Sequence, residues 1–121
     1  MPLVTLASNV PDQKFPSDFN QQLTEVLAKV TGKPAARISL HVMPGARLTH
    51  GGSDEPTCLI NMRAIGAFSD ELNVKYASAI AEFMQKTVGI KPEKCLIEFA
   101  DLESQNVSCS GTTMKVLLAK Q

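Results

Sequence analysis

Apolar positions in the first half of the chain follow two different periods, and the change between them marks the expected elements. From Phe19 to Val30 they recur at helical spacing, which predicts a helix between an N-cap at Ser17 and a stop at Gly32. The segments on either side are short and rich in apolar, strand-forming residues. We therefore expect two strands and a loop around this helix, at residues 2–7, 38–43 and 48–56.

The second half repeats this order. Ser69 is a good helix cap and Gly89 a good stop, and an apolar stripe at helical spacing lies between them. The stripe consists of Leu72, Tyr76, Ile80, Phe83 and Met84. Strands are expected on both sides of this helix, at residues 57–66 and 95–100, and the tail has one short apolar stretch at 116–118.

Together the two halves predict the fold. Each half is a β-α-β unit, whose crossover helix joins two parallel strands with a right-handed connection. Two such units side by side form a four-stranded mixed sheet with two helices on one face, an α/β (α+β) architecture. We expect a single domain over residues 1–121, with an internal repeat at about 2–56 and 57–103 and a C-terminal tail at 104–121.

This architecture leaves the second face of the sheet without a helix. Strand 57–66 has apolar residues on both faces, with Ile60 and Met62 on one side and Leu59 and Ile65 on the other. An exposed apolar face of this size is a binding surface. Because a second copy of the chain is the simplest cover, we predict a homo-oligomer packed through its sheets.

Composition and charge exclude several classes of function. The 12 basic and 12 acidic side chains cancel, which argues against nucleic-acid binding and against a polybasic membrane anchor. No apolar run reaches the roughly 18 residues of a membrane helix, and the first residues lack the features of a signal peptide, so the cytoplasm is the default location. Cys58, Cys95 and Cys109 form no C-x-x-C pair and are interpreted as buried, inert thiols, and we expect no metal site and no cofactor.

Three features are candidates for chemistry, each with a plainer alternative. His41 lies on a strand and is a candidate base, although a lone histidine is more often structural. Glu98 lies inside an apolar strand, where burial would raise the pKa of its carboxyl group unless it points to solvent or pairs with a base. The loop at 50–53 is either an anion cradle of backbone N–H groups or an ordinary turn.

Pro2 is a fourth candidate. Removal of Met1 would leave a secondary amine at the start of a strand. A free α-amino group titrates near about 8, and burial or a cation such as Lys33 lowers that pKa. A drop of about two units corresponds to about 2.7 kcal/mol and leaves a neutral amine that can take a proton from carbon. From these residues alone, an ordinary start of the chain is the favoured interpretation.

Several short motifs, in their order and spacing, are similar to one known family. The chain resembles macrophage migration inhibitory factor and its relative D-dopachrome tautomerase over essentially its whole length. The C-terminal segment 109–114 resembles the invertebrate members in particular. The matching stretches are Met1-Pro2, Asn9-Val10-Pro11, Gly32-Lys33-Pro34, His50-Gly51-Gly52-Ser53 with Glu55-Pro56, Ile65-Gly66 and Asn106-Val107.

The resemblance implies a subunit of two β-α-β units in a homotrimer whose sheets surround a central channel. It also implies an isomerase, a cofactor-free keto–enol tautomerase acting on phenylpyruvate-like acids and dopachrome in a pocket between neighbouring subunits. Pro2 matches the catalytic base of the family, Lys33 the residue that holds the substrate carboxylate, and Ile65 a pocket position whose backbone contacts substrate. Arg37 is expected to supply a second cation, as in the dopachrome tautomerase branch.

The chain departs from the family pattern at several positions. Leu96 and Glu98 stand where a tyrosine and an asparagine are usual, which changes the expected substrate preference and rate. We place Glu98 among the substrate-binding residues, either repelling an anionic substrate or, when neutral, donating a proton. The family's C-x-x-C motif is missing at 57–60, so its thiol oxidoreductase function is not inferred. The charged pair linked to chemokine-receptor mimicry is replaced by Asp12 and Gly45.

Three functions therefore remain open at this stage. The first is a tautomerase that uses Pro2 as its base. The second is a cytokine-type signalling protein, which the resemblance implies is both cytoplasmic and released without a signal peptide, and which binds the invariant-chain receptor on the cell surface. The third is a trimeric scaffold with a vestigial pocket, because of Leu96 and Glu98.

Overall fold

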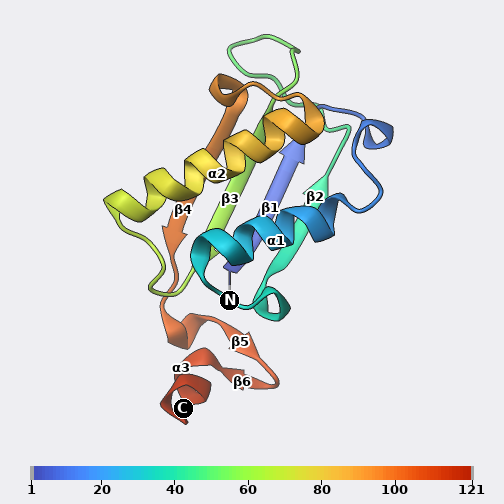
Figure 1. The fold of residues 1–121 in the computed structure, drawn as a ribbon. Coiled ribbons are helices and arrows are strands. Elements are labelled where there is room, and N and C mark those ends of the chain that lie inside the picture. The colour runs from blue at the N-terminus through green and yellow to red at the C-terminus, as the bar shows by residue number, and fades with distance from the viewer. Residues whose placement is uncertain (1, 121) are drawn as a thin grey trace.

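The computed structural model describes residues 2–120 and has the expected architecture. Four strands form one sheet in the order β2-β1-β3-β4, in which β1 is parallel to β2, antiparallel to β3, and β3 is parallel to β4. Both long helices cover the same face of this sheet (Figure 1). In chain order the elements are β1 (Pro2–Ser8), α1 (Phe19–Thr31), β2 (Ser39–Met43), β3 (Cys58–Ala64), α2 (Asp70–Val88) and β4 (Cys95–Asp101).

Local sequence signals set the ends of the long helices. The Ser69 side chain accepts a hydrogen bond from the Leu72 backbone N–H and begins α2, and Gly32 and Gly89 end the helices in the left-handed conformation with φ of 71° and 79°. The prediction of Ser17 as the first cap is wrong, because Asp18 occupies that position. No helix within residues 2–120 is long and apolar enough to cross a bilayer.

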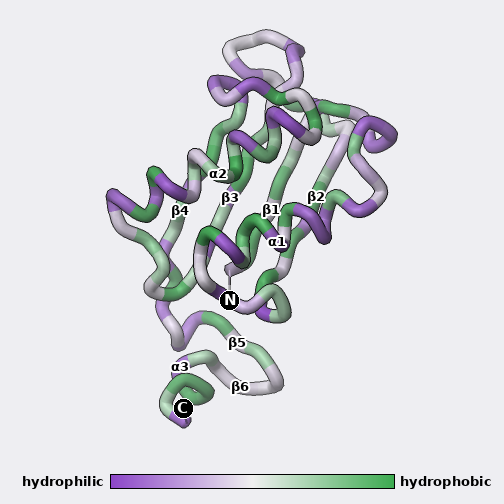
Figure 2. Tube along the Cα trace, in the orientation of Figure 1, coloured by the Kyte–Doolittle hydropathy of each residue, from purple (hydrophilic) through white to green (hydrophobic). Residues whose placement is uncertain are grey.

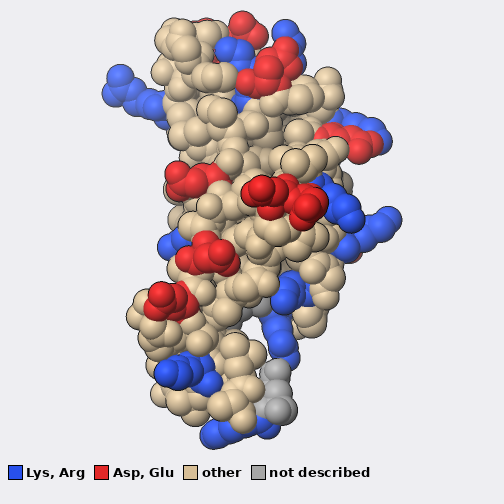
Figure 3. All heavy atoms as spheres, turned by 90° about the vertical axis from the view of Figure 1, so that its left-hand side faces the viewer, with Lys and Arg blue, Asp and Glu red and all other residues tan. Residues whose placement is uncertain are grey.

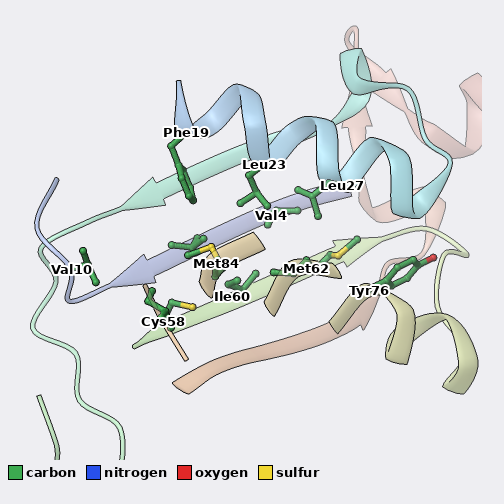
Figure 4. Packing of buried hydrophobic residues seen from close by; sticks show 13 residues of the cluster. Val4, Val10, Phe19, Leu23, Leu27, Cys58, Ile60, Met62, Tyr76 and Met84 are labelled. Carbon is green, nitrogen blue, oxygen red and sulfur yellow. The ribbon is translucent and has the colours of Figure 1, made fainter. Parts of the chain in front are cut away.

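The hydrophobic core lies between the helices and the sheet. Inward-facing residues of the central strands, among them Val4, Ile60 and Met62, are buried against the apolar stripes of α1 and α2 (Figure 4). Along the chain, hydrophobic segments follow the strands, while each helix alternates between hydrophobic and hydrophilic positions (Figure 2). Leu72 is a correction to the expected α2 stripe, because it is 38% exposed at the first turn of the helix.

The C-terminal tail forms two further strands and a helix beyond the end of the sheet (Figure 1). Strands β5 (Ser108–Cys109) and β6 (Thr112–Thr113) pair around a tight turn, and α3 (Met114–Ala119) follows. The turn residues Ser110 and Gly111 both have positive φ, at 56° and 79°. The apolar stretch expected at 116–118 therefore belongs to a short helix.

The uncovered face of the sheet corrects the expectation of an apolar surface. Strand registers align its residues in three rows across the four strands. The middle row is polar and the first row contains Arg63, whereas only the third row is apolar. In the order β2, β1, β3, β4, the rows are Ser39-Leu3-Arg63-Ala100, His41-Thr5-Asn61-Glu98 and Met43-Ala7-Leu59-Leu96.

Candidate functional site

Pro2 lies at the first position of β1, and its side chain is fully buried. Proline has no backbone N–H to give to a neighbouring strand, so the start of a strand is one of the few places in a sheet that accept it. Its register partner on β3 is Ala64. The carbonyl of Ala64 accepts a hydrogen bond of 2.8 Å from the N–H of Leu102, the residue after β4. The backbone around Pro2 is thus fixed by β3 and by the end of β4.

The two basic candidates lie in the connection between α1 and β2. The Lys33 N–H donates to Thr31 Oγ1 at 3.2 Å, which fixes the backbone just after the helix, and the Lys33 side chain is half-buried. Arg37 is exposed in a single 3₁₀ turn. The following strand begins at Ser39, whose register partner on β1 is Leu3, the neighbour of Pro2. The connection therefore reaches the end of the sheet at which Pro2 lies (Figure 1).

Ile65 directly follows Ala64, the register partner of Pro2, and is half-buried. The chain then turns at Gly66, which has a positive φ of 61°. Pro2, Ile65 and the segment carrying Lys33 and Arg37 thus meet at one end of the sheet. A buried nitrogen-bearing ring, an apolar wall and two cations are suited to a small organic anion.

Glu98 is not part of this group within one chain. It is exposed in the middle of β4, on the uncovered face, and its register partner is Asn61. The β4 residue level with Pro2 is Asp101. Glu98 lies three residues, about 10 Å, before Asp101 along β4, and β4 itself lies two strands, about 10 Å, from β1. The interpretation that Glu98 points to solvent fits this position, and a role beside Pro2 would require a second subunit.

His41 and the glycine-rich loop at 50–53 have plain structural explanations, whereas the Nδ1 atom of His50 is buried without a hydrogen-bond partner among the described residues. His41 is exposed in the polar row of the uncovered face. In the loop, the backbone N–H groups of His50 and Ser53 each donate to the other residue's carbonyl at 3.1 Å, and Gly51 and Gly52 form the tight turn between them. These two N–H groups are used within the turn, which agrees with the interpretation of the loop as an ordinary turn. Residues 2–120 contain no group of three His, Cys, Asp or Glu side chains that could hold a metal ion.

The expectation of three buried, inert thiols is wrong for Cys109, which is exposed, and for Cys95, which is half-buried. Cys58 is buried, and it lies beside Cys95 on the neighbouring strand. Cys58 and Cys95 are the first residues of β3 and β4 and are register partners. Hydrogen bonding between the thiols raises the pKa of Cys58, which burial raises further, and lowers the pKa of Cys95, where burial acts in the opposite direction. Only the register of β3 with β4 brings the two cysteines together, so no local pattern in the sequence indicated the pair.

A shallow apolar groove of about 500 Å³ lies between α1 and α2, away from Pro2. Val26, Val30 and Phe83 line it, with Lys29 and Lys86 at its rim. Acidic and basic side chains are intermingled on the molecular face shown in Figure 3, and neither sign dominates there. This distribution agrees with the zero net charge of the chain.

Comparison with solved structures defines the class of protein. The fold matches a macrophage migration inhibitory factor from Trichinella spiralis with a TM-score of 0.87 and 24% identity, covering 92% of this chain and 98% of that one. A homologue from Prochlorococcus marinus matches with a TM-score of 0.84 and 25% identity, covering 93% and 98%. The protein therefore has the fold of the tautomerase class to which these structures belong.

Comparison of sequences defines the family. The family model described as macrophage migration inhibitory factor matches residues 1–115. A MIF-like protein of Caenorhabditis elegans is 42% identical over 114 residues, which are 94% of this chain and 95% of that protein. Macrophage migration inhibitory factor of Mus musculus is 32% identical over 113 residues, 93% and 98% of the two chains. The chain belongs to the macrophage migration inhibitory factor family.

Proposed function

We propose that this protein is a cofactor-free keto–enol tautomerase, an isomerase of phenylpyruvate-like acids and dopachrome, with Pro2 as its general base. The observation that carries the proposal is the position of Pro2. Its ring is buried at the start of β1, next to Ile65 and at the same end of the sheet as Lys33 and Arg37. Membership of the family supports the same class of activity.

In this mechanism the nitrogen of Pro2 acts once Met1 has been removed. Burial disfavours the ammonium form, so the secondary amine stays neutral and accepts a proton from the carbon next to the keto group. The same proton is then returned to the carbonyl oxygen, which completes the enol without any change of oxidation state. Lys33 and Arg37 hold the substrate carboxylate, and the backbone at Ile65 contacts the substrate.

The active form in this proposal is a homotrimer with its pockets between neighbouring subunits. The helix-free face of the sheet supports it, because its row of half-exposed apolar residues at Leu59 and Leu96 is available for contact with other copies. Glu98 would reach the pocket of a neighbouring subunit from this face. In place of the usual asparagine, an ionised carboxylate there would lower the affinity for anionic substrates.

The experiment compares turnover of 4-hydroxyphenylpyruvate by samples of verified intact mass. Protein without Met1 is expected to be active. Pro2→Gly and a form with one additional alanine directly before Pro2, in which the Pro2 nitrogen is part of an amide, are expected to lose at least about 100-fold in kcat/KM. Pro92→Gly is the matched control, because Pro92 is exposed in a distant turn and should leave turnover unchanged. Full turnover by the form with the additional alanine would contradict the proposal, since an amide nitrogen is not a base.

A second function is supported by the names of the relatives, several of which are called macrophage migration inhibitory factor. We propose that the same trimer is present in the cytoplasm, is released without a signal peptide, and signals through the invariant-chain receptor. Tautomerase activity would then be weak or vestigial. Binding of the Pro2→Gly protein to the receptor ectodomain supports this function, and no binding at micromolar concentration counts against it.

A further inference from the structure

The most unusual side-chain pair outside the candidate site is formed by Cys58 and Cys95. They are register partners on adjacent parallel strands, which lie about 4.8 Å apart. That spacing falls within the range of about 4.4–6.8 Å that Cα atoms have in a disulfide. Both side chains are on the helix-covered face of the sheet, where Cys58 is fully buried and Cys95 is half-buried against the core (Figure 4 shows Cys58).

Neighbouring hydrogen bonds fix the two strand starts relative to each other. Thr57, just before Cys58, donates from Oγ1 to the carbonyl of Lys94, just before Cys95, at 2.7 Å. The Thr57 carbonyl in turn accepts from Ser8 Oγ at 2.9 Å. Thr57 and Ser8 are both buried, so this frame is shielded from water. The frame therefore holds Cys58 and Cys95 in register on neighbouring strands before any reaction.

The two thiols are chemically unequal. Hydrogen bonding from Cys58 favours the thiolate of Cys95 and lowers its pKa, whereas Cys58 itself stays protonated. Only Cys95 is also partly exposed to solvent. A partly exposed thiol whose pKa is lowered, next to a second thiol, is the arrangement found at redox-sensitive cysteines.

We propose that Cys58 and Cys95 form a two-thiol site that reduces a peroxide and closes to an intramolecular disulfide. The Cys95 thiolate attacks the O–O bond of hydrogen peroxide, forming the S–O bond of a sulfenic acid and releasing hydroxide. The Cys58 sulfur then attacks the sulfenic sulfur, forming the S–S bond. The sulfenic oxygen leaves as water with the proton from Cys58. Two electrons pass from the two sulfurs to the peroxide, and an external thiol restores the reduced pair.

This site is separate from the proposed proline site. Cys58 pairs with Ser8 at one end of β1, and Pro2 lies at the other end, six residues or about 20 Å away. The residues also differ from the C-x-x-C arrangement, because they come from two strands. The proposal for the cysteine pair and the proposal for Pro2 can therefore fail independently of each other.

The test uses the native, fully reduced protein carrying Cys109→Ser, which removes the exposed third thiol. The protein is treated with a few equivalents of hydrogen peroxide, unfolded and alkylated with N-ethylmaleimide, and its intact mass is measured. We expect the intact mass of the oxidised protein to be lower by two hydrogens, with no thiol alkylated. After reduction of the disulfide, both thiols should be alkylated again. Tandem mass spectrometry should identify one cross-linked peptide pair joining Cys58 to Cys95, and the same cross-link should form in the wild-type protein.

Two matched variants test the order of the steps. In Cys95→Ala, Cys58 is expected to remain alkylatable after the same treatment. In Cys58→Ala, Cys95 is expected to proceed to sulfinic acid because no partner intercepts it. Peroxide-treated wild-type protein in which both thiols remain alkylatable would overturn the proposal. So would sulfinic acid at Cys95 beside a free Cys58, and these two results do not depend on how the variants fold.

Discussion

Replacement of Thr57 tests whether its hydrogen bonds stabilise the fold. It is 1% exposed and joins three segments: its backbone N–H donates to Asn9 Oδ1 at 3.0 Å, its carbonyl accepts from Ser8, and its hydroxyl donates to the Lys94 carbonyl. Thr57→Val keeps the volume and the branched shape of the side chain, and it removes only the hydroxyl. The loss is therefore one buried hydrogen bond.

The expected cost follows from that single bond. A typical buried hydrogen bond contributes about 1 kcal/mol, and a carbonyl left without its partner can raise the cost to about 3 kcal/mol. We expect the free energy of unfolding to fall by about 1–2 kcal/mol, which lowers the melting temperature by roughly 4–8 °C. Urea titrations followed by circular dichroism measure this change, with all samples at one protein concentration because oligomerisation affects apparent stability.

Thr24→Val is the control, since it makes the same chemical change at a half-buried position of α1. It should change the free energy of unfolding by less than about 0.5 kcal/mol. Equal midpoints for the two variants would refute this expectation, because the hydroxyl of Thr57 would then contribute no more than that of the half-buried Thr24.

Three further predictions concern the helices. Leu27→Ala removes a fully buried side chain and should lower the free energy of unfolding by about 3 kcal/mol. Leu72→Ala changes an exposed position and should lower it by less than about 1 kcal/mol. Denaturant titration of both variants measures the difference. Ser69→Ala removes the α2 cap and should cost about 1 kcal/mol, while Ser69→Asp, which keeps a capping oxygen, should not. Burial raises the pKa of Tyr76, whose hydroxyl donates to the Ala67 carbonyl at 2.6 Å. The unfolded chain therefore loses this proton first, so stability should fall as pH rises above about 10, and less steeply in Tyr76→Phe; equal slopes would contradict this assignment.

The fold was predictable because its signals are local. Ser69 and Gly89 begin and end α2 through capping interactions that depend only on the residues at the helix ends. The start of α1 was misassigned by one residue because Ser17 and Asp18 are both good caps. The structure places Asp18 at the cap, after a turn in which the Phe19 N–H donates to the Pro16 carbonyl.

The remaining features depend on contacts that no local pattern encodes. Strands β5 and β6 have two residues each, too few to show alternation, although the Ser110-Gly111 dipeptide is a turn signal. Cys58 and Cys95 meet only through the register of β3 with β4. Glu98 was grouped with Pro2 by resemblance, and the register separates the two within one chain.

The proposed activity depends on one property of one atom, the nitrogen of Pro2 after removal of Met1. Its titration in the assembled protein, followed by ¹⁵N NMR of proline-labelled samples, measures that property directly. We expect the nitrogen to lose its proton below neutral pH, well below the value of about 8 for a free α-amino group. A nitrogen that remains protonated above pH 8 would contradict the proposed mechanism, because no neutral base would then be available.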